Sequence, residues 1–373
     1  MAPDIDTSQL PPAAQKAIDP QTPLPLRMMA AKGIVPGAKP ADSLTVLAIL
    51  SGSDESQVAS TAKATLDTLP KPILEGALAS TLSAGVLRVL VEHTFDNPET
   101  VERVLRQPQL TGESLEYLAE RATERIGELI ATNEQRMLEN PRVIEKLYMN
   151  KRVRMSTADR LIELAVRNGI EVDIPAFKEA AAAIKNELVP EPTPEPTYDD
   201  VLFTETDRLV ESLPPPDIDN DTHEATDEGE EVVKATYLPL YQRIAQMTVT
   251  QKIRRATLGS AADRLLLVRD SNRLVSAAAA KSPLLKENEA VLISSSRAMS
   301  DEVLRIIAMN REFTRNYQIK YNLVTNPRTP FSFVSRLVPH LRDADLKALL
   351  RSKNVTSTVV QAIRQQLQRK TQS

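Results

Sequence analysis

Short apolar segments that stop at Asn-Pro and resume a few residues later recur along this chain. The clearest case is residues 322–337, NLVTNPRTPFSFVSRL, in which one apolar segment reaches Asn326 and the next opens at Pro330. Proline suits the first turn of a helix, where its missing amide proton needs no partner, but it interrupts a helix interior. Ser260 and Ser300 stand before similar segments, and their hydroxyl oxygens can accept hydrogen bonds from the free amides at a helix start. The pattern predicts short helices joined by tight turns.

The composition favours helix over sheet. The 373 residues include only 10 Gly and no Trp, and aromatic residues make up 3%. A fold of strands joined by Gly-rich turns is built from more of both. Ala, Leu, Arg and Glu, which are strong helix formers, are frequent instead. We therefore expect an all-α fold.

Residues that carry catalysis or bind metals are scarce. The chain has no Cys, which excludes disulfides and thiolate metal sites, and its three His (His93, His223 and His340) are far apart. No Gly-rich phosphate loop, Gly-x-Ser-x-Gly motif or metal-ligand spacing is present. The N-terminus lacks a signal-peptide pattern, and no apolar run approaches the ~20 residues of a membrane span. We expect a cytoplasmic protein that is not an enzyme, with no catalytic residue, metal, cofactor or membrane span.

Charge changes sharply along the chain and predicts four regions. Residues 1–186 have a net charge of −4, residues 187–233 of −15 and residues 234–373 of +15. Asymmetry of this size is typical of segments with different roles. The expected regions are a disordered Pro-rich tail (1–40), an N-terminal helical-repeat domain (41–188), an acidic, Pro-rich, disordered linker (189–233) and a basic C-terminal helical-repeat domain (234–373).

The acidic linker contains one segment with helical periodicity, residues 198–213. Its apolar residues fall on the stripe of one short amphipathic helix, which is a common form of docking motif. Incidental apolar content is an equally good interpretation of the same pattern. The residues of this candidate docking motif are Val201, Leu202, Leu209, Val210 and Leu213.

The stretch from Leu323 through Asn326-Pro327 to Pro330, followed by Val334 and Leu337, resembles the units of the leucine-rich-repeat-variant class. Those units contain leucine, Asn-Pro-x-Thr-Pro, valine and leucine in this order, and the class belongs with HEAT and armadillo repeats. The resemblance implies two α-solenoid (HEAT/armadillo-like) domains, here joined by the disordered linker, and a binding role. Some members carry a Cys-ligated iron–sulfur cluster, which this chain cannot hold because it has no Cys.

Basic residues recur at the expected helix ends and turns of the C-terminal domain. Equivalent positions of successive repeats line one ridge of a solenoid, and a positive ridge attracts phosphates or an acidic protein surface. A solvated basic face is the alternative. The candidate binding ridge consists of Arg254, Arg255, Arg264, Arg269, Arg273, Arg305, Arg311, Arg315, Lys320, Arg328, Arg336, Arg342, Lys347, Arg351 and Lys353.

Two functions fit these features. The first is a scaffold or adaptor that binds a protein partner, acidic in character, through the ridge of its helical-repeat array. The second is a nucleic-acid-binding protein whose basic domain is screened by the acidic linker, because residues 217–231 are tethered beside that domain at high effective concentration. Phosphate binding weakens steeply with salt, whereas a largely apolar protein interface does not.

Overall fold

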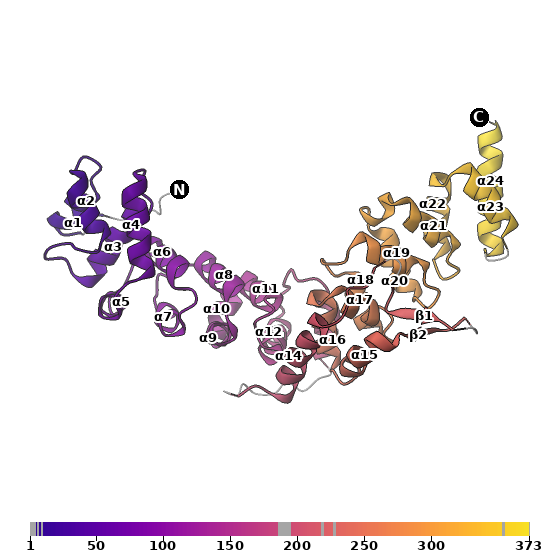
Figure 1. The fold of residues 1–373 in the computed structure, drawn as a ribbon, viewed down its shortest axis with the longest axis horizontal. Coiled ribbons are helices and arrows are strands. Elements are labelled where there is room, and N and C mark those ends of the chain that lie inside the picture. The colour runs from indigo at the N-terminus through magenta and orange to yellow at the C-terminus, as the bar shows by residue number, and fades with distance from the viewer. Residues whose placement is uncertain are drawn as a thin grey trace. The chain divides into compact units, whose positions relative to one another are not determined.

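A computed structural model of the chain describes residues 5, 7, 8, 10–185, 195–217, 220–226, 229–352 and 355–372. It confirms the all-α fold class. These residues form twenty-four α-helices, three short 3-10 helices and one two-stranded sheet (Figure 1). The contacts between Cα atoms divide the chain into two compact units, Met1–Val172 and Asp173–Ser373. None of the described helices combines the length and apolar content required to cross a lipid bilayer.

The first unit consists of short helices that pack in two rows. In one row α4, α6, α8 and α11 pack each on the next, and in the other α7 packs on α9 and α9 on α12. The apolar stripe of each helix is therefore covered by its neighbours in space. The helices are α1 (Pro12–Ile18), α2 (Leu24–Ala31), α3 (Pro40–Ser51), α4 (Ser56–Asp67), α5 (Lys71–Leu78), α6 (Ala84–Thr94), α7 (Pro98–Val104), α8 (Gly112–Arg121), α9 (Glu124–Ala131), α10 (Glu134–Glu139), α11 (Pro141–Met149) and α12 (Met155–Arg167).

The region expected to be a disordered tail, residues 1–40, contains α1 and α2, which pack on α3 and α4. Pro12 and Pro25 lie in the first turn of α1 and α2, where a proline costs no backbone hydrogen bond. The buried Arg27 anchors α2, because its Nη1 lies 2.8 Å from Glu55 Oε2 and its Nη2 lies 2.8 Å from Ser53 Oγ. The expectation of a disordered tail is therefore wrong for residues 12–31.

The second unit also contains two rows of packed helices. One row is formed by α16, α18 and α20, and the other by α17, α19 and α21. The elements are α13 (Phe177–Ile184), α14 (Tyr198–Glu211), β1 (His223–Ala225), β2 (Glu231–Val233), η1 (Ala235–Tyr237), α15 (Leu238–Ala245), α16 (Val249–Leu258), α17 (Ala261–Leu267), α18 (Arg273–Ala280), α19 (Glu287–Ser295), α20 (Asp301–Met309), η2 (Phe313–Arg315), α21 (Tyr317–Thr325), α22 (Phe331–Leu337), η3 (Val338–His340), α23 (Asp343–Arg351) and α24 (Ser357–Gln372).

The helix α13, expected at the end of the N-terminal domain, packs instead against α16 and α18 of the second unit. Glu179 on α13 also forms an ion pair of 2.5 Å with Lys281, 102 residues further along the chain. This helix was expected in the N-terminal domain because it follows α12 closely in sequence. The Ala-rich face of α13 is buried by helices that follow it much later in sequence.

Much of the segment expected to be a disordered linker has a defined structure in the second unit. Residues 186–194, 218, 219, 227 and 228 lie outside the described residues. Of the rest, α14 packs on α15, and β1 pairs with β2 as an antiparallel hairpin in the register His223 with Val233. The carboxylates of this segment bind arginines of the second unit, which offsets the like-charge repulsion that had favoured disorder.

Four helix ends are followed by a polar residue whose side chain donates a hydrogen bond to a carbonyl at the end of a helix about one helix pair earlier in the chain. These carbonyl-capping residues are Gln107, Asn150, Ser282 and Asn326. Asn326 Nδ2 donates to the Ser294 and Ser296 carbonyls at 3.0 and 2.8 Å, and its Oδ1 accepts from Arg328 N. Asn150 has the same arrangement in the first unit, with the Ala119 and Ala122 carbonyls at 3.0 and 2.8 Å. These carbonyls have no partner inside their own helix, so the side chains satisfy groups that would otherwise be buried unpaired.

Candidate functional site

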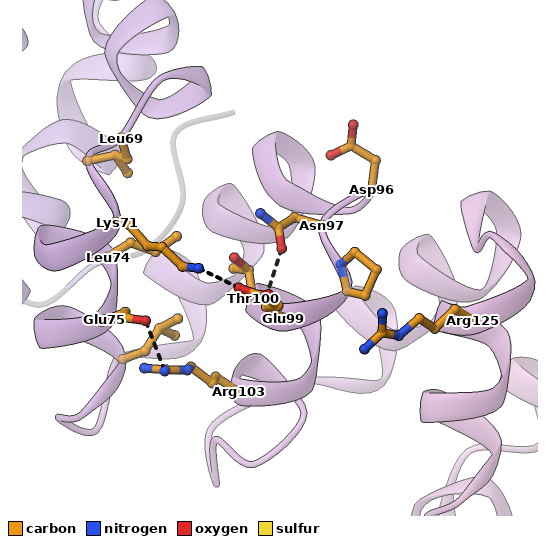
Figure 2. A pocket seen from close by; sticks show the side chains of 12 residues that line it. Leu69, Lys71, Leu74, Glu75, Asp96, Asn97, Glu99, Thr100, Arg103 and Arg125 are labelled. Atoms are coloured by element: carbon orange, nitrogen blue, oxygen red, sulfur yellow. Dashed lines mark hydrogen bonds and ion pairs between the residues drawn. The ribbon is translucent and has the colours of Figure 1, made fainter. Parts of the chain in front are cut away.

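A charged groove of about 610 Å³ crosses successive helices of the first unit (Figure 2). Its apolar floor includes Leu74 and Leu78 of α5, which are almost fully buried. Charged residues of α5, α7 and α9 form its walls. They are Lys71, Glu75, Glu99, Arg103 and Arg125, and Asp96, Asn97, Pro98 and Thr100 complete the α7 end of the groove.

Two ion pairs join α5 to α7 across this groove. Lys71 Nζ lies 2.7 Å from Glu99 Oε2, and Arg103 Nη2 lies 3.0 Å from Glu75 Oε1. The hydrogen bond and charge of Lys71 lower the pKa of Glu99, with smaller contributions from Arg125 and Arg103. The same contact with Glu99 raises the pKa of Lys71. All four side chains are substantially exposed, so these pairs contribute little to stability.

Arg125 differs from the other cations of the groove. It extends from the start of α9 toward the first residues of α7 (Figure 2), and it is exposed. No other described residue forms a hydrogen bond or an ion pair with its guanidinium. The groove therefore offers a free guanidinium beside an apolar floor. That combination fits a peptide segment with a carboxylate next to an apolar side chain.

The proposed ridge of the second unit is not a single exposed surface. Arg254, Arg255 and Arg264 are buried, so the prediction that they line an exposed ridge is wrong for these three. Arg255 Nε lies 2.7 Å from Asp263 Oδ1, and its Nη1 lies 3.0 Å from Asp207 Oδ1. The positive charge of Arg255 is therefore neutralised inside the fold, as expected for a buried arginine, whose burial is tolerated when carboxylates pair with it.

Arg264 of α17 and Glu289 of α19 form a second buried pair. Arg264 Nη2 lies 2.7 Å from Glu289 Oε1, and Nε lies 2.8 Å from Oε2. The remaining guanidinium nitrogen, Nη1, donates to the Gly259 carbonyl at 2.7 Å. The side chains are 4% and 1% exposed, so this bidentate pair joins successive helices and is inaccessible to a ligand.

Arg269, which follows α17, is held by the acidic hairpin. Its Nη2 lies 2.7 Å from Asp221 Oδ2, and its Nε lies 3.0 Å from Glu231 Oε2. The other Glu231 oxygen accepts from Ser296 Oγ at 2.6 Å, so the hairpin spans the turns that follow α17 and α19. Burial and the nearby charge of Arg269 lower the pKa of His223 to about 4.

The other members of the ridge prediction are more accessible. Lys320 is half-buried, Lys353 lies outside the described residues, and the guanidinium of Arg342 lies over the ring of Tyr317. Arg305 and Arg315 pair with Glu302 and Glu312 on their own helical turns. The exposed members are Arg273, Arg305, Arg311, Arg315, Arg328, Arg336, Arg342, Lys347 and Arg351.

The candidate docking motif lies on α14, and its central residues pack within the second unit. Leu202 is 1% exposed, whereas Val201 is 44% exposed and faces solvent. Leu209, Val210 and Leu213 are half-buried. The neighbouring Phe203 ring lies 5.3 Å from the Arg255 guanidinium, and Glu205 pairs with Arg243. The motif therefore contacts its own chain, and only part of its apolar surface is free.

Sequence reasoning missed the groove of the first unit and the exposed Arg297 in the turn after α19. Lys71 precedes Glu99, and Glu75 precedes Arg103, by the same interval of 28 residues. That repeated interval was the available signal for a site shared by α5 and α7. Arg125 and Arg297 gave no comparable signal, because their significance depends on the lack of a facing carboxylate.

Among the described residues, no group of three His, Asp or Glu side chains is arranged to hold a metal ion. A second hollow of about 660 Å³ lies in the second unit between the hairpin and α15–α17, and is lined by Val232, Leu238, Tyr241 and Arg269 among others.

Comparisons of the chain with protein-family models, with curated proteins and with solved structures found no match.

Proposed function

We propose that this protein is an adaptor whose two units are helical-repeat arrays of the HEAT/armadillo type and bind other proteins. The hydrogen bonds of the carbonyl-capping residues support the repeat organisation. In both units an Asn that follows a helix caps the helix one pair earlier, with the same three kinds of contact. Stacking of this kind buries the apolar stripes and leaves the sides of successive helices open to partners.

The groove of the first unit carries the proposal. A partner segment that places an apolar side chain over Leu74 and a carboxylate on Arg125 finds both requirements in one hollow. Because Lys71 is paired with Glu99 and Arg103 with Glu75, a partner carboxylate can bind Arg125 without breaking an existing ion pair of the groove.

The test compares the full chain as bait with the double variant Arg103→Glu/Arg125→Glu. A matched control is Arg88→Glu/Arg106→Glu, which makes the same charge change at two exposed positions outside the groove. We expect a bound protein, identified by mass spectrometry after nuclease treatment, to be recovered by the wild type and the control but lost with the groove variant. Equal recovery by all three baits would refute the groove as the binding surface.

Nucleic-acid binding by the second unit is the alternative, favoured by its net charge of +15 over residues 234–373. The internal pairing of Arg255, Arg264 and Arg269 reduces the charge available for it. If this function holds, nuclease treatment will remove the captured material. Affinity for a DNA duplex will then fall by orders of magnitude between low and physiological salt.

A further inference from the structure

Three successive turns of the second unit, those after α17, α19 and α21, lie against one another. Glu231 accepts from both Arg269 and Ser296, which joins the first turn to the second. Asn326 donates to the carbonyls of Ser294 and Ser296, which joins the third turn to the second. Each turn contributes one arginine, and together Arg269, Arg297 and Arg328 form what we call the cation row.

The members of the cation row differ in how they are paired. Arg269 is held by Asp221 and Glu231 of the hairpin. Arg297 and Arg328 are exposed, and no other described residue forms a hydrogen bond or an ion pair with either guanidinium. The turns that contain them, residues 296–299 and 326–330, include no Asp or Glu. Carboxylates therefore occupy one end of the row, and two guanidinium groups continue it unpaired.

We propose that the cation row binds an extended acidic segment of a partner protein, with carboxylates on Arg297 and Arg328. The hairpin supports this choice of ligand, because carboxylates from its two arms, Asp221 and Glu231, bind the neighbouring Arg269. This inference deepens the proposed adaptor function and rests on it for the class of partner. It concerns the second unit, so its failure leaves the groove test of the first unit unaffected.

Helix packing sets the spacing that the ligand has to match. Packed helices lie about 8–10 Å apart, so neighbouring arginines of the row are separated by roughly that distance. A peptide in the polyproline II conformation advances about 3.1 Å per residue with three residues per turn, so acidic residues at every third position face the same side at about this spacing. The turns contain no aromatic side chain on which bases can stack, and this favours an acidic peptide over single-stranded nucleic acid.

Arginines beyond helix C-termini also offset the negative end of the helix dipole. That stabilising role needs no ligand, and it predicts a different effect of substituting these arginines. If it is the only role, charge reversal at Arg297 and Arg328 will lower thermal stability, and no acidic peptide will distinguish the variant from the wild type. If the row does bind acidic peptides, the variant will remain folded and will bind the peptide more weakly than the wild type does.

The probe is a fluorescent peptide of twelve residues with Glu at every third position, titrated into the full chain at low salt and followed by anisotropy. We expect Arg297→Glu/Arg328→Glu to bind at least about tenfold more weakly, which is the effect of two charge-assisted contacts of ~0.7 kcal/mol each. Arg311→Glu/Arg336→Glu, the control with the same charge change at exposed positions outside the row, should stay within about threefold of the wild type. Circular dichroism verifies that both variants are folded.

Three results would overturn the proposal. Equal loss in the row and control variants would mean that only net charge is sensed. Equal affinity for a peptide with its Glu residues in one block would remove the spacing argument. Tighter binding of a single-stranded oligonucleotide of equal charge, sensitive to the row variant, would assign the row to nucleic acid instead.

The hairpin provides a second, independent test. The double variant Asp221→Asn/Glu231→Gln removes two negative charges from beside Arg269, at one end of the row. The spaced peptide is then expected to bind several-fold more tightly, because the positive charge of this end of the row is no longer neutralised. Unchanged or weaker affinity would contradict the assignment of Arg269 to the same row.

Discussion

Replacing Arg264 by Met removes the cation from a buried, bidentate ion pair of the second unit. Glu289, whose side chain is 1% exposed, then keeps its carboxylate without the two hydrogen bonds of 2.7 and 2.8 Å. The Gly259 carbonyl also loses its donor at 2.7 Å. Breaking a buried pair by removing one partner costs about 3–5 kcal/mol, because the charge that remains is neither solvated nor paired.

The assay is thermal unfolding of the full chain, followed by circular dichroism and by calorimetry to separate the transitions. For a folding unit of this size each kcal/mol shifts Tm by about 2–4 °C, so the transition of the second unit should fall by roughly 6–20 °C. The first unit contains neither residue, and its transition should stay in place.

Two control variants test whether the loss comes from the unpaired Glu289 carboxylate. Arg305→Met breaks a pair with Glu302 that is partly exposed to solvent, and should cost about 0.5 kcal/mol or less. Arg264→Met/Glu289→Met removes both charges and should recover most of the loss, since apolar replacement of a complete buried pair is often neutral. Equal stability of Arg264→Met and Arg305→Met, or equal stability of Arg264→Met and Arg264→Met/Glu289→Met, would refute the cost assigned to the unpaired Glu289 carboxylate.

The other predictions concern the carbonyl-capping residues and the hairpin. Asn326→Ala and Asn150→Ala should each lower the free energy of unfolding by about 1–3 kcal/mol in chemical denaturation, because carbonyls are left without donors. Asn310→Ala, at an exposed helix end with only local contacts, is the control and should cost less. In the folded protein the pKa of His223 is lowered from 6.5 to about 4, so as the pH falls His223 is protonated in the unfolded chain before it is protonated in the folded protein. The free energy of unfolding therefore decreases as the pH drops through that interval. His223→Gln should reduce this dependence, and an identical pH profile would contradict it.

Local sequence signals correctly predicted several helix starts. Ser260 Oγ accepts from Asp263 N, and Ser300 Oγ accepts from Val303 N, as the capping pattern indicated. The same kind of reasoning failed for residues 12–31, because proline in a first helical turn and proline in a mobile tail look alike in sequence. It failed again for the acidic segment. The partners of Asp207 and Asp221 there are arginines 48 residues away, beyond any local pattern.

Several charge partners in this fold recur at an interval of one helix pair. Glu289 follows Arg264 by 25 residues, and Arg103 follows Glu75 by 28. A cation with a facing carboxylate at this interval is joined to its neighbouring helix, whatever its apparent place on a ridge. Net charge and local pattern alone cannot separate Arg264 from Arg328, since both are arginines near helix ends in a strongly basic region. The interval of one helix pair accounts for Arg264, whereas the partners of Arg255 and Arg269 lie as far as 48 residues away. Only the folded structure therefore distinguishes the arginines that hold the stack together from those that remain available to a partner.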